Sequence, residues 1–106
     1  MRKLTALFAA SVLSLAVIVG VAGAVTAPNT TVHYQITHKK TQYFHIVSSK
    51  GTGTAKCKRD KRAWYTCGLG GETLRNLSKG LHTFRAKAIY KGKADPTPFV
   101  KTFRVN

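Results

Sequence analysis

The chain has only two cysteines, Cys57 and Cys67, and the nine residues between them include its single tryptophan, Trp64. A charged stretch between two segments that favour strands predicts a β-hairpin, with one cysteine on each arm. A disulfide between them would close a short loop and restrict the unfolded chain, which stabilises a fold by roughly 2–3 kcal/mol. The spacing does not match the Cys-x-x-Cys motif of thiol oxidoreductases, so we expect a structural bond rather than a redox pair.

The first 24 residues have the three parts of a secretory signal peptide. Two basic residues precede an apolar run over residues 4–21, and small residues end it at Ala24. We therefore expect a signal helix that is cleaved after Ala24, with residues 25–106 exported to an oxidising compartment where a disulfide persists. The alternative is an uncleaved helical anchor, since the apolar run approaches the thickness of a bilayer.

The expected mature chain is strongly basic. Of the 18 Lys and Arg residues, two lie in the signal, which leaves 16 against three acids and a net charge of about +13. Such a charge attracts polyanions. It also exceeds the magnitude of about 2–8 that serves the solubility of a small domain. The charge therefore indicates an anionic partner, although it does not specify which one.

Alternation of apolar and polar residues predicts short strands after the signal. Residues 81–90 alternate most clearly, so that Phe84 and Ala86 should face inward while Arg85 and Lys87 face outward. Further strands are expected at residues 31–37, 42–48, 54–58, 63–67 and 100–105. The residues expected to be buried are Ile46, Trp64, Phe84, Ala86, Ala88, Phe103 and Val105, and those expected to be exposed are Arg85, Lys87 and Arg104.

The remaining segments are expected to be connections, apart from one whose secondary structure the sequence does not decide. Glycine-rich residues 68–71 predict a loop, and residues 91–98, with two prolines, predict a rigid connection. Residues 72–77 fit either a strand or a single helical turn. About seven short strands with frequent turns predict an all-β sandwich over residues 32–106, after a mobile lead-in of residues 25–31.

A set of short motifs follows in order from Phe44 to Val105. They are Phe44 with Ser48 and Ser49, Cys57, Asp60, Trp64, Cys67, Gly-Leu-His-Thr-Phe at 80–84, Ala88, Asp-Pro-Thr-Pro at 95–98 and Phe-Arg-Val at 103–105. The set resembles the immunoglobulin-like repeats of secreted and cell-surface bacterial proteins. The resemblance implies an immunoglobulin-like β-sandwich and a place at or outside the cell surface.

The chain also departs from that family. Ala55 stands where an aromatic residue often precedes the first cysteine, and residues 90–93 replace an acidic turn, which removes groups that calcium would need. Family members usually occur as repeats in long, often acidic proteins, whereas this chain carries one strongly basic copy. We therefore expect no calcium site.

The sequence shows no constellation for catalysis, a metal or a cofactor. The four histidines, His33, His38, His45 and His82, include no pair at the helical i, i+4 step, and no Gly-x-Ser-x-Gly motif occurs. We expect a non-enzymatic protein with no metal site and no cofactor. Trp64 and Tyr65 have a second interpretation, as an aromatic platform for a sugar or a base.

Outward-facing cations are the candidate binding residues. In an immunoglobulin-like topology the strands that carry them are neighbours, so we expect one cationic face. Its candidate residues are Lys56, Lys58, Arg59, Lys61, Arg62, Arg85, Lys87 and Arg104. The plain alternative is a solvated surface that serves only solubility.

Two functions fit this pattern. The first is a cell-envelope module that binds anionic polymers, nucleic acid or anionic lipid surfaces. The second is a secreted cationic effector or an adhesion-like domain that binds another protein. A steep loss of binding with added salt would favour the first, because counterion release dominates polyanion affinity.

Overall fold

The computed structural model describes residues 24–106, which contain β-strands and no helix. The strands are β1 (Thr30–Tyr34), β2 (Gln42–Ser48), β3 (Thr54–Arg59), β4 (Tyr65–Thr66), β5 (Gly70–Leu74), β6 (Gly80–Tyr90), β7 (Lys93–Ala94) and β8 (Phe99–Val105). The expected signal peptide lies outside the described residues except for Ala24. In the described part, no helix is long and apolar enough to cross a membrane.

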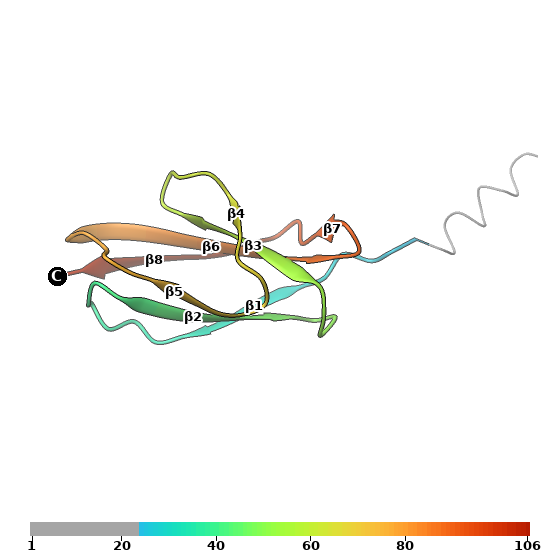
Figure 1. Cartoon of the computed structure of the whole chain (residues 1–106), viewed down its shortest axis with the longest axis horizontal. Helices are drawn as coiled ribbons and strands as arrows, with labels where there is room; N and C mark the ends of the chain where they lie inside the picture. The colour runs from blue at the N-terminus through green and yellow to red at the C-terminus, as the bar shows by residue number, and fades with distance from the viewer. Residues whose placement is uncertain (1–23) are drawn as a thin grey trace, which may run out of the picture.

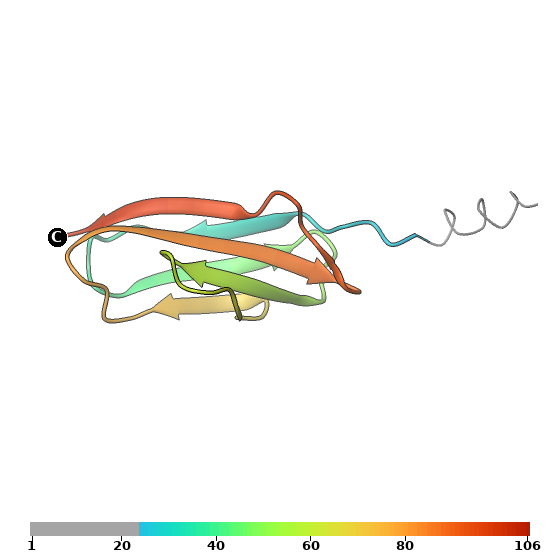
Figure 2. The same cartoon turned by 90° about the horizontal axis from the view of Figure 1, so that it is seen from above.

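The strands form two antiparallel sheets that pack face to face (Figure 1). The smaller sheet has the order β1-β2-β5, and the larger one contains β4, β3, β6, β7 and β8. Strand β6 pairs with β3 along one edge and with β7 and β8 along the other (Figure 2). The predicted all-β class is confirmed, and β6 is the central element of the larger sheet.

The core lies between the sheets and is built on the predicted alternation. Phe44 of β2 and Phe84 of β6 are fully buried and stack with their ring centroids 4.2 Å apart. Phe103 of β8 packs 6.0 Å from Phe44. The predicted burial of Ile46, Phe84, Ala86, Ala88, Phe103 and Val105 is confirmed.

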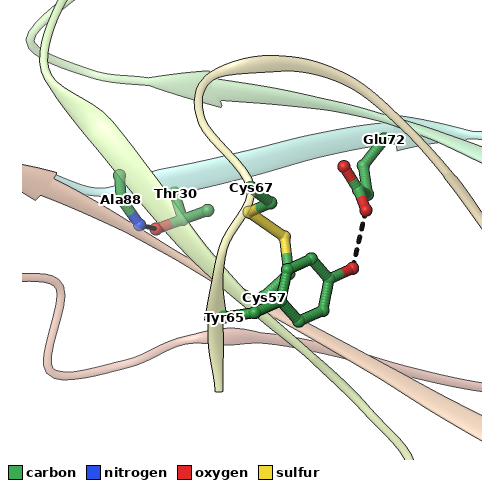
Figure 3. The surroundings of a disulfide bond; sticks show 6 residues. All are labelled: Thr30, Cys57, Tyr65, Cys67, Glu72 and Ala88. Atoms are coloured by element: carbon green, nitrogen blue, oxygen red, sulfur yellow. Dashed lines mark hydrogen bonds between the residues drawn. A yellow bond between two sulfur atoms is a disulfide. The ribbon is translucent and has the colours of Figure 1, made fainter. Parts of the chain in front are cut away.

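A clamp of hydrogen bonds joins the two sheets near the start of β1. Thr30 donates from its backbone N–H and its hydroxyl to Oδ2 of Asp95, over 2.8 and 2.7 Å. The same hydroxyl accepts a hydrogen bond from the backbone N–H of Ala88 on β6, over 2.9 Å (Figure 3). β1 therefore begins at Thr30, one residue before the expected start, and it ends at Tyr34 rather than at residue 37. Pro28, just before it, is already buried.

The loop predicted for the glycines at 68–71 is wrong in its second half, because β5 begins at Gly70. The reason lies on the neighbouring strand, where the ring of Tyr43 covers Gly71. A Cβ atom at Gly71 would lie 2.7 Å from Cε1 of Tyr43, so the absence of a side chain is what allows this packing. For residues 72–77, where the sequence allows a strand or a helical turn, the structure has a strand that ends at Leu74.

The predicted burial of Trp64 is wrong as well. Its side chain is only half-buried and lies on the outer face of the larger sheet, against Lys87. The second arm of the hairpin is also shorter than expected, with β4 limited to Tyr65 and Thr66. Because Trp64 precedes that strand, its side chain is free to turn away from the core.

Short strand β7 occupies part of the expected 91–98 connection.

Candidate polyanion-binding face

Strand β3 sends its cations to the outer face of the larger sheet. Ala55 and Cys57 are fully buried. Successive residues of a strand point to opposite faces, so Lys56 and Lys58 point away from the core. Lys56 is exposed and Lys58 is half-exposed.

Strand β6 has the same arrangement in its second half. Phe84, Ala86 and Ala88 are fully buried, which places Arg85 and Lys87 on the outer face. Both are half-exposed rather than fully exposed. The outward direction predicted for these two residues is confirmed.

The strand register brings these four side chains together. Lys56 is the partner of Lys87, and Lys58 is the partner of Arg85. Residues directly opposite each other in an antiparallel pair have Cβ atoms about 5 Å apart. The four residues therefore form two adjacent rows of two cations, which we call the cation cluster.

An aromatic ring supports one corner of the cation cluster. Nζ of Lys87 lies 4.2 Å from the centroid of the Trp64 ring. Such a contact attracts a cation to the ring face and limits the mobility of a long side chain. Trp64 thus gives Lys87 a defined position in the row that it shares with Lys56.

Two other candidates lie near the cation cluster but outside it. Lys61, in the turn after β3, lines a hollow of about 490 Å³ together with Asp60, Leu81, Thr83 and Arg85. Arg104 of β8 is exposed and pairs with Leu81, four residues from Arg85, or about 13 Å along the strand. Arg104 therefore extends the cationic face without joining the rows.

The structure separates Arg59 and Arg62 from the cation cluster. Arg59 pairs with the inward-facing Phe84, and it donates from Nη1 to the backbone carbonyl of Arg75 over 3.1 Å. Both arginines line a second hollow of about 310 Å³ between the hairpin and β5, beside Arg75. Sequence reasoning missed Arg75, because residues 72–77 had no assigned structure and gave no signal of this proximity.

The three acids of the chain are engaged in internal hydrogen bonds. Asp95 accepts the two hydrogen bonds from Thr30 described above. Glu72 accepts a hydrogen bond from the Tyr65 hydroxyl over 2.6 Å. Asp60 accepts a hydrogen bond from the Thr83 N–H and contacts the His82 ring, each over 2.8 Å. In residues 24–106 the one contact within 4 Å between a basic side chain and a carboxylate is His82–Asp60. No carboxylate in this range therefore neutralises a Lys or Arg of the cation cluster by direct contact.

The disulfide supports the cation cluster from beneath. Cys57 and Cys67 are bonded, with their Cα atoms 5.7 Å apart, as the sequence predicts. The bond fixes short strand β4 against β3 on the inner side of the sheet, opposite to the lysines. The Tyr65–Glu72 hydrogen bond then ties β4 to β5 (Figure 3). Burial raises the pKa of the Tyr65 hydroxyl, and the neighbouring Glu72 carboxylate raises it further.

Comparisons with known proteins supply no relative. No family model, no curated protein and no solved structure matches the chain. Within residues 24–106, no group of three or more His, Cys, Asp or Glu side chains is placed to hold a metal ion.

Proposed function

We propose that this protein is a secreted, non-enzymatic, immunoglobulin-like module of the bacterial cell envelope that binds anionic polymers through the cation cluster. The observation that carries the proposal is the register of β3 and β6, which sets Lys56 against Lys87 and Lys58 against Arg85. Like charges directly opposite each other destabilise an antiparallel pair. A ligand that neutralises both rows relieves this repulsion.

A repetitive anion suits this arrangement better than a compact one. The two rows lie two residues apart along β6, or about 7 Å. A flexible chain with repeated negative groups can contact both rows at once and extend toward Lys61 or Arg104. Each contact releases counterions, so affinity grows with the number of contacts and requires no particular sequence. We therefore expect weak, salt-sensitive and unselective binding.

The secreted and immunoglobulin-like parts of the proposal have separate support. Two packed antiparallel sheets suit an immunoglobulin-like sandwich, and the Cys57–Cys67 disulfide suits an oxidising compartment. The apolar segment before Ala24 suits a cleaved signal. Sequencing the N-terminus of protein recovered from the medium or cell wall tests this part, and a chain that retains Met1 contradicts cleavage.

The binding test compares two variants of equal charge. The first replaces the cation cluster with glutamine, as Lys56→Gln, Lys58→Gln, Arg85→Gln and Lys87→Gln. The control replaces four exposed lysines elsewhere, as Lys39→Gln, Lys40→Gln, Lys50→Gln and Lys79→Gln. Both lower the net charge by four, so a difference between them reports position rather than total charge.

Binding of both variants is measured to double-stranded DNA, to isolated cell walls and to vesicles of anionic lipid. The proposal expects the cluster variant to lose most of its affinity for at least one of these polyanions while the control retains most of it. Equal losses would assign the binding to net charge alone. Circular dichroism of each variant verifies that the sheets remain.

A second function, binding to another protein, has one observation in its favour. Leu81 and Val100 are 62% and 52% exposed, and Val100 is the register partner of Arg85. Apolar side chains beside cations suit a protein surface better than a polymer of phosphates or sulfates. Leu81→Ser with Val100→Ser should leave polyanion binding unchanged, whereas it should abolish capture of a protein partner.

A further inference from the structure

Two histidines lie directly opposite each other on the outer face of the smaller sheet. His33 of β1 is the register partner of His45 of β2. Both are exposed, and their ring centroids lie 6.4 Å apart with an angle of 41° between the ring planes. Neighbouring Val32 and Ile46 are buried, so the strand alternation directs both imidazoles to the same solvent-exposed face.

The surroundings of this pair differ from those of the cation cluster. The other outward residues of the three strands are uncharged; they are Thr31, Tyr43, Val47, Gly71 and Thr73. The cation cluster lies on the opposite face of the sandwich, and the two sheets themselves are separated by about 10 Å. At physiological ionic strength the screening length is about 8 Å, so the cluster repels a small cation at this pair only weakly.

We propose that His33 and His45 together bind one divalent transition-metal ion. Imidazole nitrogen suits copper, zinc and nickel, and Cu²⁺ binds most tightly to a given set of nitrogen ligands. Metal–nitrogen bonds of about 2 Å require the two ligating atoms to approach to roughly 3 Å. Cβ atoms about 5 Å apart on opposed strands allow this approach through rotation of two exposed side chains, without movement of the backbone. Water completes the coordination.

The rigid strand pair is what distinguishes this site from any two surface histidines. Once one ring holds the metal, the second is presented at a high effective concentration, because the register fixes its position. Sequence reasoning missed the site, since a search for helical i, i+4 spacing does not detect partners on opposed strands. The site uses residues outside the cation cluster, so it can fail or succeed independently of polyanion binding.

The test is a titration of untagged protein with Cu²⁺ alone, followed by electron paramagnetic resonance and by the paramagnetic loss of NMR signals. We expect one tight equivalent with two nitrogen ligands, and signal loss centred on β1 and β2. His33→Gln or His45→Gln should each weaken binding roughly a hundredfold, because each destroys the chelate. The double variant should bind more weakly still, because no imidazole ligand remains at the pair.

The matched control is His38→Gln, since His38 is also exposed but lies outside the strands. It should leave the affinity for Cu²⁺ unchanged. The proposal is overturned if the His38 variant weakens binding as much as the His33 and His45 variants, or if each of these two weakens it by no more than a factor of two. Unfolding curves without metal should coincide for the parent and the His33 and His45 variants, which separates loss of a ligand from loss of the fold.

Discussion

Asp60 and His82 hold the far end of β3 onto β6, with Oδ2 of Asp60 lying 2.8 Å from Nδ1 of His82. The other ring nitrogen, Nε2, lies 2.7 Å from the backbone carbonyl oxygen of Ser78. Carbonyl and carboxylate oxygens only accept hydrogen bonds, so the imidazole ring is the donor toward these two partners. Oδ1 of Asp60 accepts from the Thr83 N–H over 2.8 Å, which completes the tie between the two strands.

Because this tie includes a carboxylate, the stability of the fold depends on pH. Burial by itself raises the pKa of Asp60, but the hydrogen bonds from His82 and Thr83 outweigh it and leave the pKa below its usual value. At Asp95, burial again raises the pKa, but hydrogen bonds from Thr30 and Thr97 outweigh it and leave the pKa below its usual value. A carboxyl whose pKa is lower in the folded state stabilises fully above its unfolded value of about 4 and ceases to do so as the pH falls through the folded value.

Asp60→Asn tests this dependence. Asparagine tolerates the positive φ of 54° at this position, so the main change is loss of the carboxylate. We expect the variant to be less stable than the parent at pH 7, and the gap to close as the pH falls below about 4. Denaturant unfolding at a series of pH values measures both curves. A gap that stays constant down to pH 2 would show that the Asp60 charge does not stabilise the fold.

Thr30→Val tests the clamp between the sheets. The substitution keeps the shape but removes the hydroxyl that donates to Asp95 and accepts from the Ala88 N–H. Leaving a buried polar group without its partner costs about 1–3 kcal/mol. We expect that loss in the free energy of unfolding, with faster hydrogen exchange at the Ala88 amide. Thr31→Val, on the exposed side of β1, is the control and should change neither measurement.

The Cys57–Cys67 disulfide should stabilise without determining the fold. It closes a loop with a sequence separation of 10, for which the constraint on the unfolded chain is worth about 2–3 kcal/mol. Reduction should lower the free energy of unfolding by this amount and leave the far-ultraviolet circular dichroism unchanged, and so should Cys57→Ala with Cys67→Ala. Thiol titration of the unreduced, unfolded protein should find no free thiol. Two free thiols in exported protein would contradict the bond.

The contact of Phe44 with Phe84 joins the centres of the two sheets. Phe84→Ala removes a fully buried ring and should cost about 3–5 kcal/mol, which is enough to unfold a domain of this size. Phe84→Leu keeps much of the volume and should cost less than about 1.5 kcal/mol. Chemical denaturation of the leucine variant therefore stays informative if the alanine variant does not fold. Equal, small losses for both would place the ring outside the core.

The sequence predicted burial best where one face of a long strand packs on the core. Along β6 a shift of one residue would exchange Phe84 with Arg85, so the hydrophobic pattern permits a single orientation. The opposed cation pairs were harder to anticipate, because they require the register between β3 and β6. The outward direction of Lys58 and Arg85 follows from each strand alone, but their pairing does not.

Errors arose where a residue's environment comes from a distant part of the chain. Trp64 was expected in the core, yet its ring lies on the outer face against the Lys87 ammonium of another strand. Gly71 was expected in a loop on its backbone freedom, yet the Tyr43 ring covers it within a sheet. The conformational preferences of neighbouring residues in the sequence do not predict either contact. The opposed pair of His33 and His45 was missed for the same reason.

The salt dependence of polyanion binding tests the central claim most directly. The association constant for double-stranded DNA is measured over a range of salt concentrations for the parent, for the cluster variant with Lys56, Lys58, Arg85 and Lys87 changed to glutamine, and for the control variant of equal charge. Each phosphate contact contributes about 0.9 to the slope of log K against log salt. We predict that the magnitude of the slope falls by about three to four in the cluster variant and by less than one in the control. Equal slopes for the two variants would contradict it.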